Sequence, residues 1–180
     1  MNQAIQEQPG TKTTERPLYS PGLEGVIAGE SALCQVDEGE AGLRYRGYAI
    51  GDLAKWSRFE EVAYLLLIGH LPTRSELDSF STLLRGHRVL PDPVQRFIDS
   101  LQPGLHPMDV LRTGISLLGL SDPDAQDGSH EANLRKSMRL LSQIPLLIAH
   151  SYRVMAGTVP QRSDESRDFA QHLLHLVAGH

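Results

Sequence analysis

From Ser57 onward the sequence repeats one pattern: a helix-capping residue, an apolar stripe at helical spacing, and a glycine or polar break. The stretches "SRFE", from Ser57, and "TRSE", from Thr73, place Ser or Thr three residues before Glu, which is the capping-box arrangement. The apolar residues that follow each box recur at intervals of three and four, so they share one helix face. Gly69 and Gly86 stand where these two helices are expected to end. This pattern predicts a mainly α-helical chain.

The same reasoning predicts four further helices. In "PDPVQRFIDSL", Asp92 is the expected N-cap, and a proline occupies the first helical position. The next helix is predicted over residues 107–118, and a long amphipathic helix is predicted over residues 134–155. Pro145 should kink the long helix. A last helix is expected from about Glu165 into "FAQHLLHLVAG".

Two short runs before these helices, "GVIAGESALCQV" and "LRYRGYAI", are rich in β-forming and aromatic residues. The acidic stretch "DEGEAG", residues 37–42, lies between them and contains two glycines, so a β-hairpin is predicted. Residues 1–21 are polar and are expected to form a disordered tail. The predicted fold is therefore mainly α, with an N-terminal β-hairpin followed by about six helices over residues 22–180.

The 180 residues carry a net charge of -5. Phosphate backbones are bound by clustered cations, and the arginines here are scattered among acids, so no nucleic-acid partner is expected. The most apolar run, residues 144–149, is too short to cross a bilayer, and the N-terminus has no apolar signal segment, so no membrane association is expected. Cys34 is the single cysteine. It excludes an internal disulfide and fits a reducing, cytoplasmic location.

Few residues outside the predicted core carry evident chemistry. Cys34 has no base or thiolate-stabilising group near it in the sequence, so it is interpreted as a buried structural residue rather than a nucleophile. In "HLLH", His172 and His175 lie one helical turn apart, with His180 close by, but no acidic or thiol third ligand stands at helical spacing. These histidines are interpreted as the edge of an amphipathic helix. A shared metal ion is the weaker alternative, and no metal site is predicted.

The stretch "RGHR", Arg85 to Arg88, places two guanidinium groups and an imidazole just past a predicted helix end. Favourable placement of cations at the negative helix end is the simpler interpretation, and a clamp for a carboxylate is the alternative. Arg44 and Arg46 alternate with tyrosines in a predicted strand and are expected to form surface ion pairs. His106 precedes the proline that starts a helix and has no partner for acid–base work, so a structural role is favoured.

Five phrases resemble one family. "GLEGVIAGESAL", "YRGYAIGDLA", "FEEVAYLLLIGHLPT", "HPMDVLRTGIS" and "FAQHLLHLVAGH" are similar, in order and spacing, to the N-terminal part of citrate synthases, above all the bacterial citrate and 2-methylcitrate synthase branch. The resemblance implies an almost wholly α-helical fold with a large and a small domain that close over a cleft. Residues 22–180 are then expected to be a large domain that is incomplete at its C-terminus, with the small domain absent.

The family consists of homodimeric acyltransferases that condense acetyl-CoA or propionyl-CoA with oxaloacetate. The resemblance therefore implies no cofactor beyond the coenzyme A thioester, which is a substrate. In the family, a histidine and an aspartate move a proton from the thioester's methyl group, a second histidine polarises the ketone, and arginines hold the carboxylates. The resemblance also implies that helices 107–118 and 134–155 lie in a dimer core, which makes His106 part of the scaffold.

The family's histidine-bearing phrases, such as "HADH" or "YAEH" and "LHGGAN", do not occur in residues 1–180. No catalytic residue is therefore assigned, and the chain alone is expected to be inactive. One contact is carried over: an arginine in a phrase like "RSHR" touches substrate in the short bacterial enzymes, and Arg85 in "RGHR" holds that position. The alternative hypothesis is a non-catalytic helical protein that pairs with a full-length synthase through helices 107–118 and 134–155.

Overall fold

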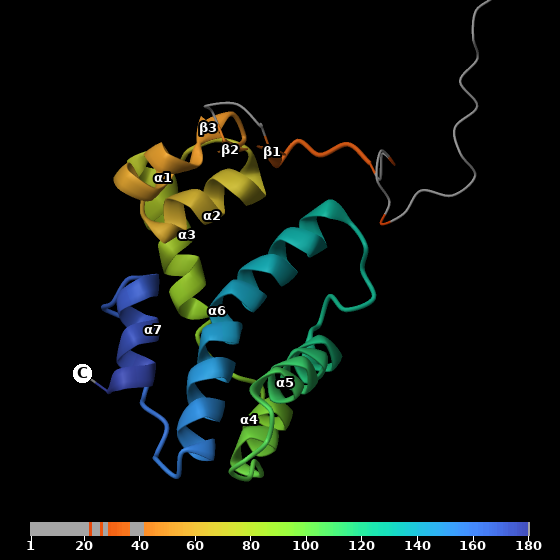
Figure 1. Ribbon diagram of the computed structural model, residues 1–180, viewed down its shortest axis with the longest axis vertical. Helices are drawn as coiled ribbons and strands as arrows, with labels where there is room; N and C mark the ends of the chain where they lie inside the picture. The colour runs from red at the N-terminus through yellow and green to blue at the C-terminus, as the bar shows by residue number, and fades with distance from the viewer. Residues whose placement is uncertain (1–21, 23–25, 27–28, 37–41, 180) are drawn as a thin grey trace, which may run out of the picture. The chain divides into compact units, whose positions relative to one another are not determined.

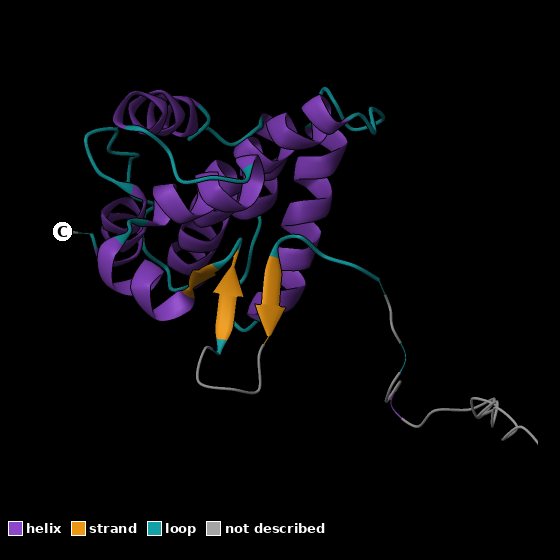
Figure 2. Ribbon diagram, turned by 90° about the horizontal axis from the view of Figure 1, so that it is seen from above, coloured by secondary structure: helices purple, strands orange, loops and turns teal. Residues whose placement is uncertain are grey.

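The computed structural model describes residues 22, 26, 29–36 and 42–179, and the α-helices and β-strands of this part of the chain all lie after residue 31. Residues 1–21, predicted as a tail, lie outside the described residues, as do residues 37–41 of the predicted turn. Three short strands form an antiparallel sheet, visible in Figure 2, in the order β1 (Cys34–Val36), β2 (Leu43–Tyr45) and β3 (Tyr48–Ala49). The predicted pairing of the first two strands is confirmed, since Gln35 lies opposite Arg44.

The predicted second strand is interrupted by a turn. Arg46 and Gly47 have positive φ angles of 47° and 89°, so the chain reverses between β2 and β3 as in a two-residue hairpin. Directly after β3 the chain enters a helix of seven residues that the sequence pattern did not predict. The helix buries a single side chain, Leu53, and therefore has no apolar stripe to reveal it.

Seven helices follow the sheet in the described part of the chain, one more than the six or so predicted. They are α1 (Ile50–Trp56), α2 (Phe59–Ile68), α3 (Arg74–Gly86), α4 (Asp92–Asp99), α5 (Pro107–Ser121), α6 (His130–Met155) and α7 (Phe169–Ala178). Figure 1 shows α6, the longest, between α4 and α5 on one side and α7 on the other. It contacts α3, α4, α5 and α7. None of the described helices is both long and apolar enough to span a membrane.

The two predicted capping boxes have different outcomes. The box at Thr73 is confirmed, because its hydroxyl accepts the N–H of Glu76 and the Glu76 carboxylate accepts the Thr73 N–H at 2.7 Å. The box at Ser57 is wrong by one residue. Ser57 ends α1, and Arg58 is the N-cap of α2, donating its N–H to Glu61 at 2.7 Å.

The long helix α6 starts at His130, four residues before the prediction, because the Ser129 hydroxyl accepts the N–H of Ala132 and caps the helix there. Pro145 lies inside it. Figure 1 shows the axis of α6 changing direction part-way along, as the proline predicts.

Two other helix starts differ from the sequence-based expectation. The N-cap of α4 is Pro91, and Asp92 is the first helical residue and makes no capping bond. The last helix, α7, begins at Phe169 and not near residue 165, because Asp168 accepts the N–H of Gln171 and forms the cap.

The main apolar core lies where α4, α5 and α6 meet. Val94, Ile98 and Leu147 are fully buried there. Gly114 of α5 faces α6 so closely that an added Cβ would lie 2.5 Å from a methyl carbon of Leu147. The two helices therefore pack without room for a larger side chain at this position.

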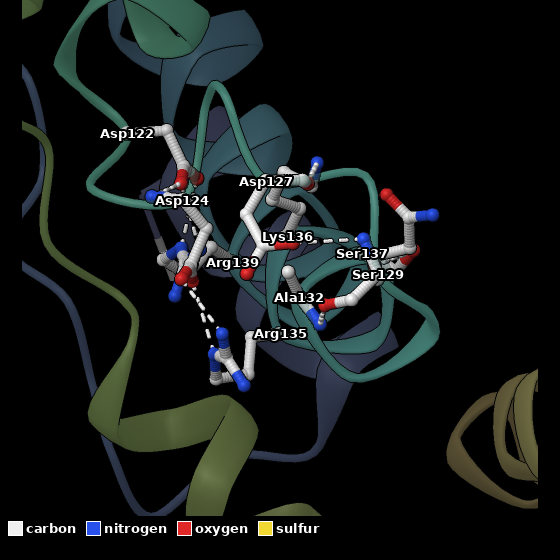
Figure 3. Close-up of polar contacts among 10 residues, drawn as sticks. Asp122, Asp124, Asp127, Ser129, Ala132, Arg135, Lys136, Ser137 and Arg139 are labelled. Carbon is white, nitrogen blue, oxygen red and sulfur yellow. Dashed lines mark hydrogen bonds and ion pairs between the residues drawn. The ribbon is translucent and has the colours of Figure 1, made fainter.

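An ion-pair cluster fixes the loop between α5 and α6 (Figure 3). The Arg139 guanidinium donates to Asp122 at 2.7 and 2.8 Å and also to Asp124, and Arg135 donates to Asp124 at 2.7 and 3.0 Å. The Arg139 and Asp122 side chains are only 14% and 12% exposed. We call these four residues the Asp–Arg clamp. Its bonds to Arg139 and to the Asp124 backbone hold the pKa of Asp122 below its usual value, against the opposing effect of burial.

Candidate functional site

Arg85, the one residue for which the sequence suggested a ligand contact, lies in the last turn of α3. Its side chain is half-buried and lines a polar groove of about 210 Å³ formed by α2, α3 and the start of α7. We call this the Arg85 groove. Its lining residues are Arg58, Glu60, Glu61, Arg74, Leu77, Asp78, Ser81, Arg85 and Asp168.

One wall of the Arg85 groove is the junction between α2 and α7. Glu60 is 7% exposed, and its carboxylate accepts the N–H of Phe169 at 2.7 Å. Beside this bond the rings of Phe59 and Phe169 stack with their centroids 3.7 Å apart. The sequence pattern assigned Glu60 to a helix cap and therefore missed its contact with the Phe169 backbone. The one sequence feature that could have indicated a buried contact is a charged residue within an apolar stretch.

The other acids of the groove also have donors. Glu61 accepts from a backbone N–H, Asp168 caps α7, and Asp78 pairs with Arg74 at 3.3 Å. The guanidinium of Arg85, by contrast, makes no hydrogen bond or ion pair with any residue that the structure describes. Arg85 is thus a half-buried cation without a carboxylate partner, in a groove whose own carboxylates are occupied.

Arg88, the second arginine of "RGHR", does not join Arg85. It is 8% exposed, and its Nη1 donates to the carbonyl oxygens of Asp164 at 3.2 Å and Arg167 at 3.0 Å. Burial and the nearby Arg85 charge lower its pKa from the ordinary value. The interpretation of Arg88 as a cation at a helix end is therefore wrong, because it anchors the segment before α7. Arg88 is thus held by backbone carbonyls of this segment, and Arg85 is the less buried of the two arginines.

The histidines of "HLLH" are structural contacts in the described chain. His172 is 2% exposed, and its Nε2 lies 2.9 Å from the Ser163 hydroxyl, so it is buried rather than at a helix edge. The Nε2 of His175 lies 3.2 Å from the carbonyl oxygen of Arg162. Within the described residues, no three or more His, Cys, Asp or Glu side chains gather where they could hold a metal ion. His180 lies outside the described residues.

His106 has the structural role predicted for it. It is the N-cap of α5, and its Nδ1 accepts the N–H of Met108 at 3.3 Å. The prediction for Cys34 is wrong, because this residue is exposed on the short strand β1. Among the described residues Arg44 and Arg46 form no ion pair, and their guanidinium groups donate to the backbone carbonyls of Gly47 and Leu66 at 3.1 and 3.2 Å; the acids of the predicted turn lie outside the described residues.

Two apolar grooves run along α6. The first, of about 420 Å³, lies between α5 and α6 and is called the α5–α6 groove; the second, of about 610 Å³, lies between α2, α6 and α7 and is called the α2–α7 groove. Ile148 lines both and is 43% exposed. Met108 and Tyr152 of the α5–α6 groove are exposed, and Ile115 and Leu120 are further exposed apolar residues of α5. Apolar grooves with exposed lining residues are typical of contact areas.

The comparison with known proteins identifies the family. A family model described as "Citrate synthase, C-terminal domain" matches residues 22–180. The chain belongs to the citrate synthase family. It is 39% identical over 165 residues to a 2-methylcitrate synthase of Mycobacterium tuberculosis, covering 92% of this chain and 42% of the relative. It is 41% identical over 167 residues to the 2-methylcitrate synthase of Shewanella oneidensis, covering 91% and 43%.

Solved structures agree with this membership. The citrate synthase of Pyrobaculum aerophilum superimposes with a TM-score of 0.81 at 29% identity, over 99% of this chain and 47% of that one. The citrate synthase of Thermotoga maritima gives a TM-score of 0.78 at 33% identity, over 88% and 41%. The resemblance carried by the five phrases and the mainly α-helical fold are therefore confirmed. The chain spans less than half the length of these relatives.

Proposed function

We propose that this chain supplies part of the large domain of a synthase that condenses acetyl-CoA or propionyl-CoA with oxaloacetate. Family membership supports this, as do the 2-methylcitrate synthases among its relatives at 39% and 41% identity. In this proposal residues 1–180 are not catalytic by themselves, because none of the family's histidine-bearing phrases occurs among them. The compartment that fits a protein with a free, exposed cysteine is a reducing one, such as the cytoplasm.

Within this function Arg85 is proposed to bind a carboxylate of the substrate. The observation that supports it is a half-buried guanidinium in the Arg85 groove that has no hydrogen-bond or ion-pair partner among the described residues. A planar guanidinium binds a carboxylate through two parallel hydrogen bonds, which suits a dicarboxylic keto acid such as oxaloacetate. The groove alone has more acids than arginines, four against three, so its affinity depends on the further cations of a complete site.

A chimera tests the function and the arginine together. Residues 22–180 of this chain would replace the matching segment of the Shewanella oneidensis 2-methylcitrate synthase, which is 41% identical. We expect coenzyme A release from propionyl-CoA with oxaloacetate. Arg85→Ala in the chimera should lower kcat/KM for oxaloacetate about 10- to 100-fold, as loss of a charged hydrogen bond predicts.

Arg74→Ala is the matched control, because Arg74 lines the same groove but is 88% exposed and already paired with Asp78. It should change kcat/KM less than about twofold, as expected for a surface ion pair. A folded, dimeric chimera without activity counts against the proposed function. An active chimera unaffected by Arg85→Ala removes Arg85 from the site.

The proposed partner is a second copy of the chain, bound through α5 and α6, with pairing to a full-length synthase as the alternative. The α5–α6 groove and the exposed apolar residues of these helices support it, because their apolar surface is unfavourable in water by about 25 cal/mol per Å². A symmetric dimer would bring the same face of each copy together.

A further inference from the structure

Residues 157–168, which we call the α6–α7 strap, are held to the helices mainly by side chains. His150 of α6 and His175 of α7 each place Nε2 near a strap carbonyl oxygen, at 3.1 Å from Gln161 and 3.2 Å from Arg162. A carbonyl only accepts, so both rings must donate from Nε2, and the neutral ring then has its lone pair on Nδ1.

Both of these Nδ1 atoms are buried and have no partner among the described residues. A proton added to Nδ1 of His150 would create a buried donor and a buried positive charge with nothing among the described residues to accept it. Burial of this ring therefore favours its neutral form.

The third histidine, His172, lies deeper. It is 2% exposed and meets the strap through Ser163 at 2.9 Å. The groups that face it are the guanidinium of Arg88, the imidazoles of His150 and His175, and the carboxylate of Asp164. Only the last of these would stabilise a charged ring.

Two arginines complete the attachment. Arg88 donates to the carbonyls of Asp164 and Arg167, and Arg153 donates to that of Val159 at 2.6 Å. Around His150, the nearby charges are Asp99 and Arg153, which oppose each other. Protonation of His172 would thus add positive charge beside the buried Arg88, and protonation of His150 would add it beside Arg153.

We propose that His150 and His172 form an acid-sensitive latch, which holds the strap and α7 on α6 while both rings are neutral and releases them when the rings are protonated. The latch rests on contacts within the chain and not on the proposed function. The latch is connected to the Arg85 groove through α7. The first residue of this helix, Phe169, donates its N–H to Glu60 in the groove wall.

The direction of the pH effect follows from proton linkage. Burial, followed by the charges of Arg88 and His175, lowers the pKa of His172 from 6.5 to about 4, and burial also lowers the pKa of His150. A lowered histidine pKa contributes stability to the latched state above about pH 6.5, and this contribution is lost as the pH falls toward 4. Between pH 7.5 and 5.0 His172 alone should favour release by about 10- to 30-fold.

Hydrogen exchange of the full chain at pH 7.5 and 5.0 tests the latch. The readout is the protection factor of α7 amides, which is the exchange rate corrected for the intrinsic chemical rate at each pH, with α3 amides as the internal reference. We expect α7 protection to fall at least about tenfold at pH 5.0 while α3 changes little. In the double variant H150Q/H172Q, glutamine keeps an N–H donor without titrating, so the fall should disappear.

The control variant H70Q/H130Q removes two exposed histidines and should behave as the wild type. Constant α7 protection in the wild type, or an equal fall in the double variant, would overturn the latch. If the double variant does not fold, NMR titration of the wild-type imidazoles decides. A His172 ring that titrates below about pH 5 supports the latch, and one that titrates above about pH 6 contradicts it.

Discussion

The two ends of α6 and its sides differ in how well other residues of the same chain cover them. The connections at its two ends are closed by charged and polar side chains of the same chain, namely the Asp–Arg clamp before the helix and the α6–α7 strap after it. The sides of α6 are open, because the α5–α6 and α2–α7 grooves expose apolar lining to solvent. The Asp–Arg clamp and most polar atoms of the strap are hydrogen-bonded within the chain, whereas the apolar lining of the two grooves is exposed to solvent. Exposed apolar grooves of this kind are the feature on which the proposed second copy rests.

The Asp–Arg clamp provides the prediction with the largest effect. Arg139→Met keeps most of the apolar part of the side chain but removes the guanidinium group that pairs with the mostly buried carboxylates of Asp122 and Asp124. The free energy of unfolding should fall by about 3 kcal/mol, because a buried ion pair is costly to break from one side. Denaturant titration measures this. Arg74→Met is the control, and this exposed pair should contribute less than about 0.5 kcal/mol.

The same clamp makes the protein sensitive to strong acid. The pKa of Asp122 and that of Asp124 both lie below the ordinary value because of their bonds to arginines. A lowered carboxyl pKa contributes stability above about pH 4, and the contribution is lost as the pH falls through the lowered pKa. In Arg139→Met the loss of stability below pH 4 should be smaller than in the wild type. If the free energy of unfolding of Arg139→Met falls below pH 4 as much as that of the wild type, the clamp is not the source of the acid sensitivity. If the loss depends on protein concentration, contacts between molecules contribute to it.

Substitutions where α5 packs against α6 should change the free energy of unfolding less than loss of the clamp does. Gly114→Val would place new atoms against the methyl groups of the fully buried Leu147, and it should cost about 2 kcal/mol through overpacking. Gly119→Ala lies in the same helix with nothing near its added Cβ, so it should stabilise the protein by up to about 1 kcal/mol. Equal effects of the two substitutions would contradict the close packing of these helices.

The sequence predicted the existence of six helices but only some of their starts, since the local caps Ser129 and Asp168 were missed and the box at Ser57 was misplaced. Thr73 and Glu76 form their box from residues three apart, and His106 caps α5 through its own neighbour. The roles of single side chains were missed where a distant residue is the partner. Glu60 binds the backbone of Phe169, and Arg88 binds carbonyls of residues 164 and 167, so neither role has a short-range signal.

The candidate site was predictable only in part for the same reason. Arg85 was found through a resemblance in "RGHR", but no spacing rule separates it from Arg88, three residues on and buried. The three histidines of the strap come from α6 and α7, and only folding brings them to one segment. Their common role appears in the contacts and not in the "HLLH" pattern.

Sedimentation velocity of the purified chain over a range of concentrations, at pH 7.5, tests most directly whether its open apolar faces are covered by a second copy. We expect a dimer or larger species for the wild type. Ile148→Glu, which charges a residue of both apolar grooves, should shift it toward monomer, whereas Leu174→Glu, an exposed residue outside both grooves, should not. A wild-type chain that sediments as a single monomer at all concentrations and unfolds in one sharp transition would contradict the assignment of these faces to a second copy.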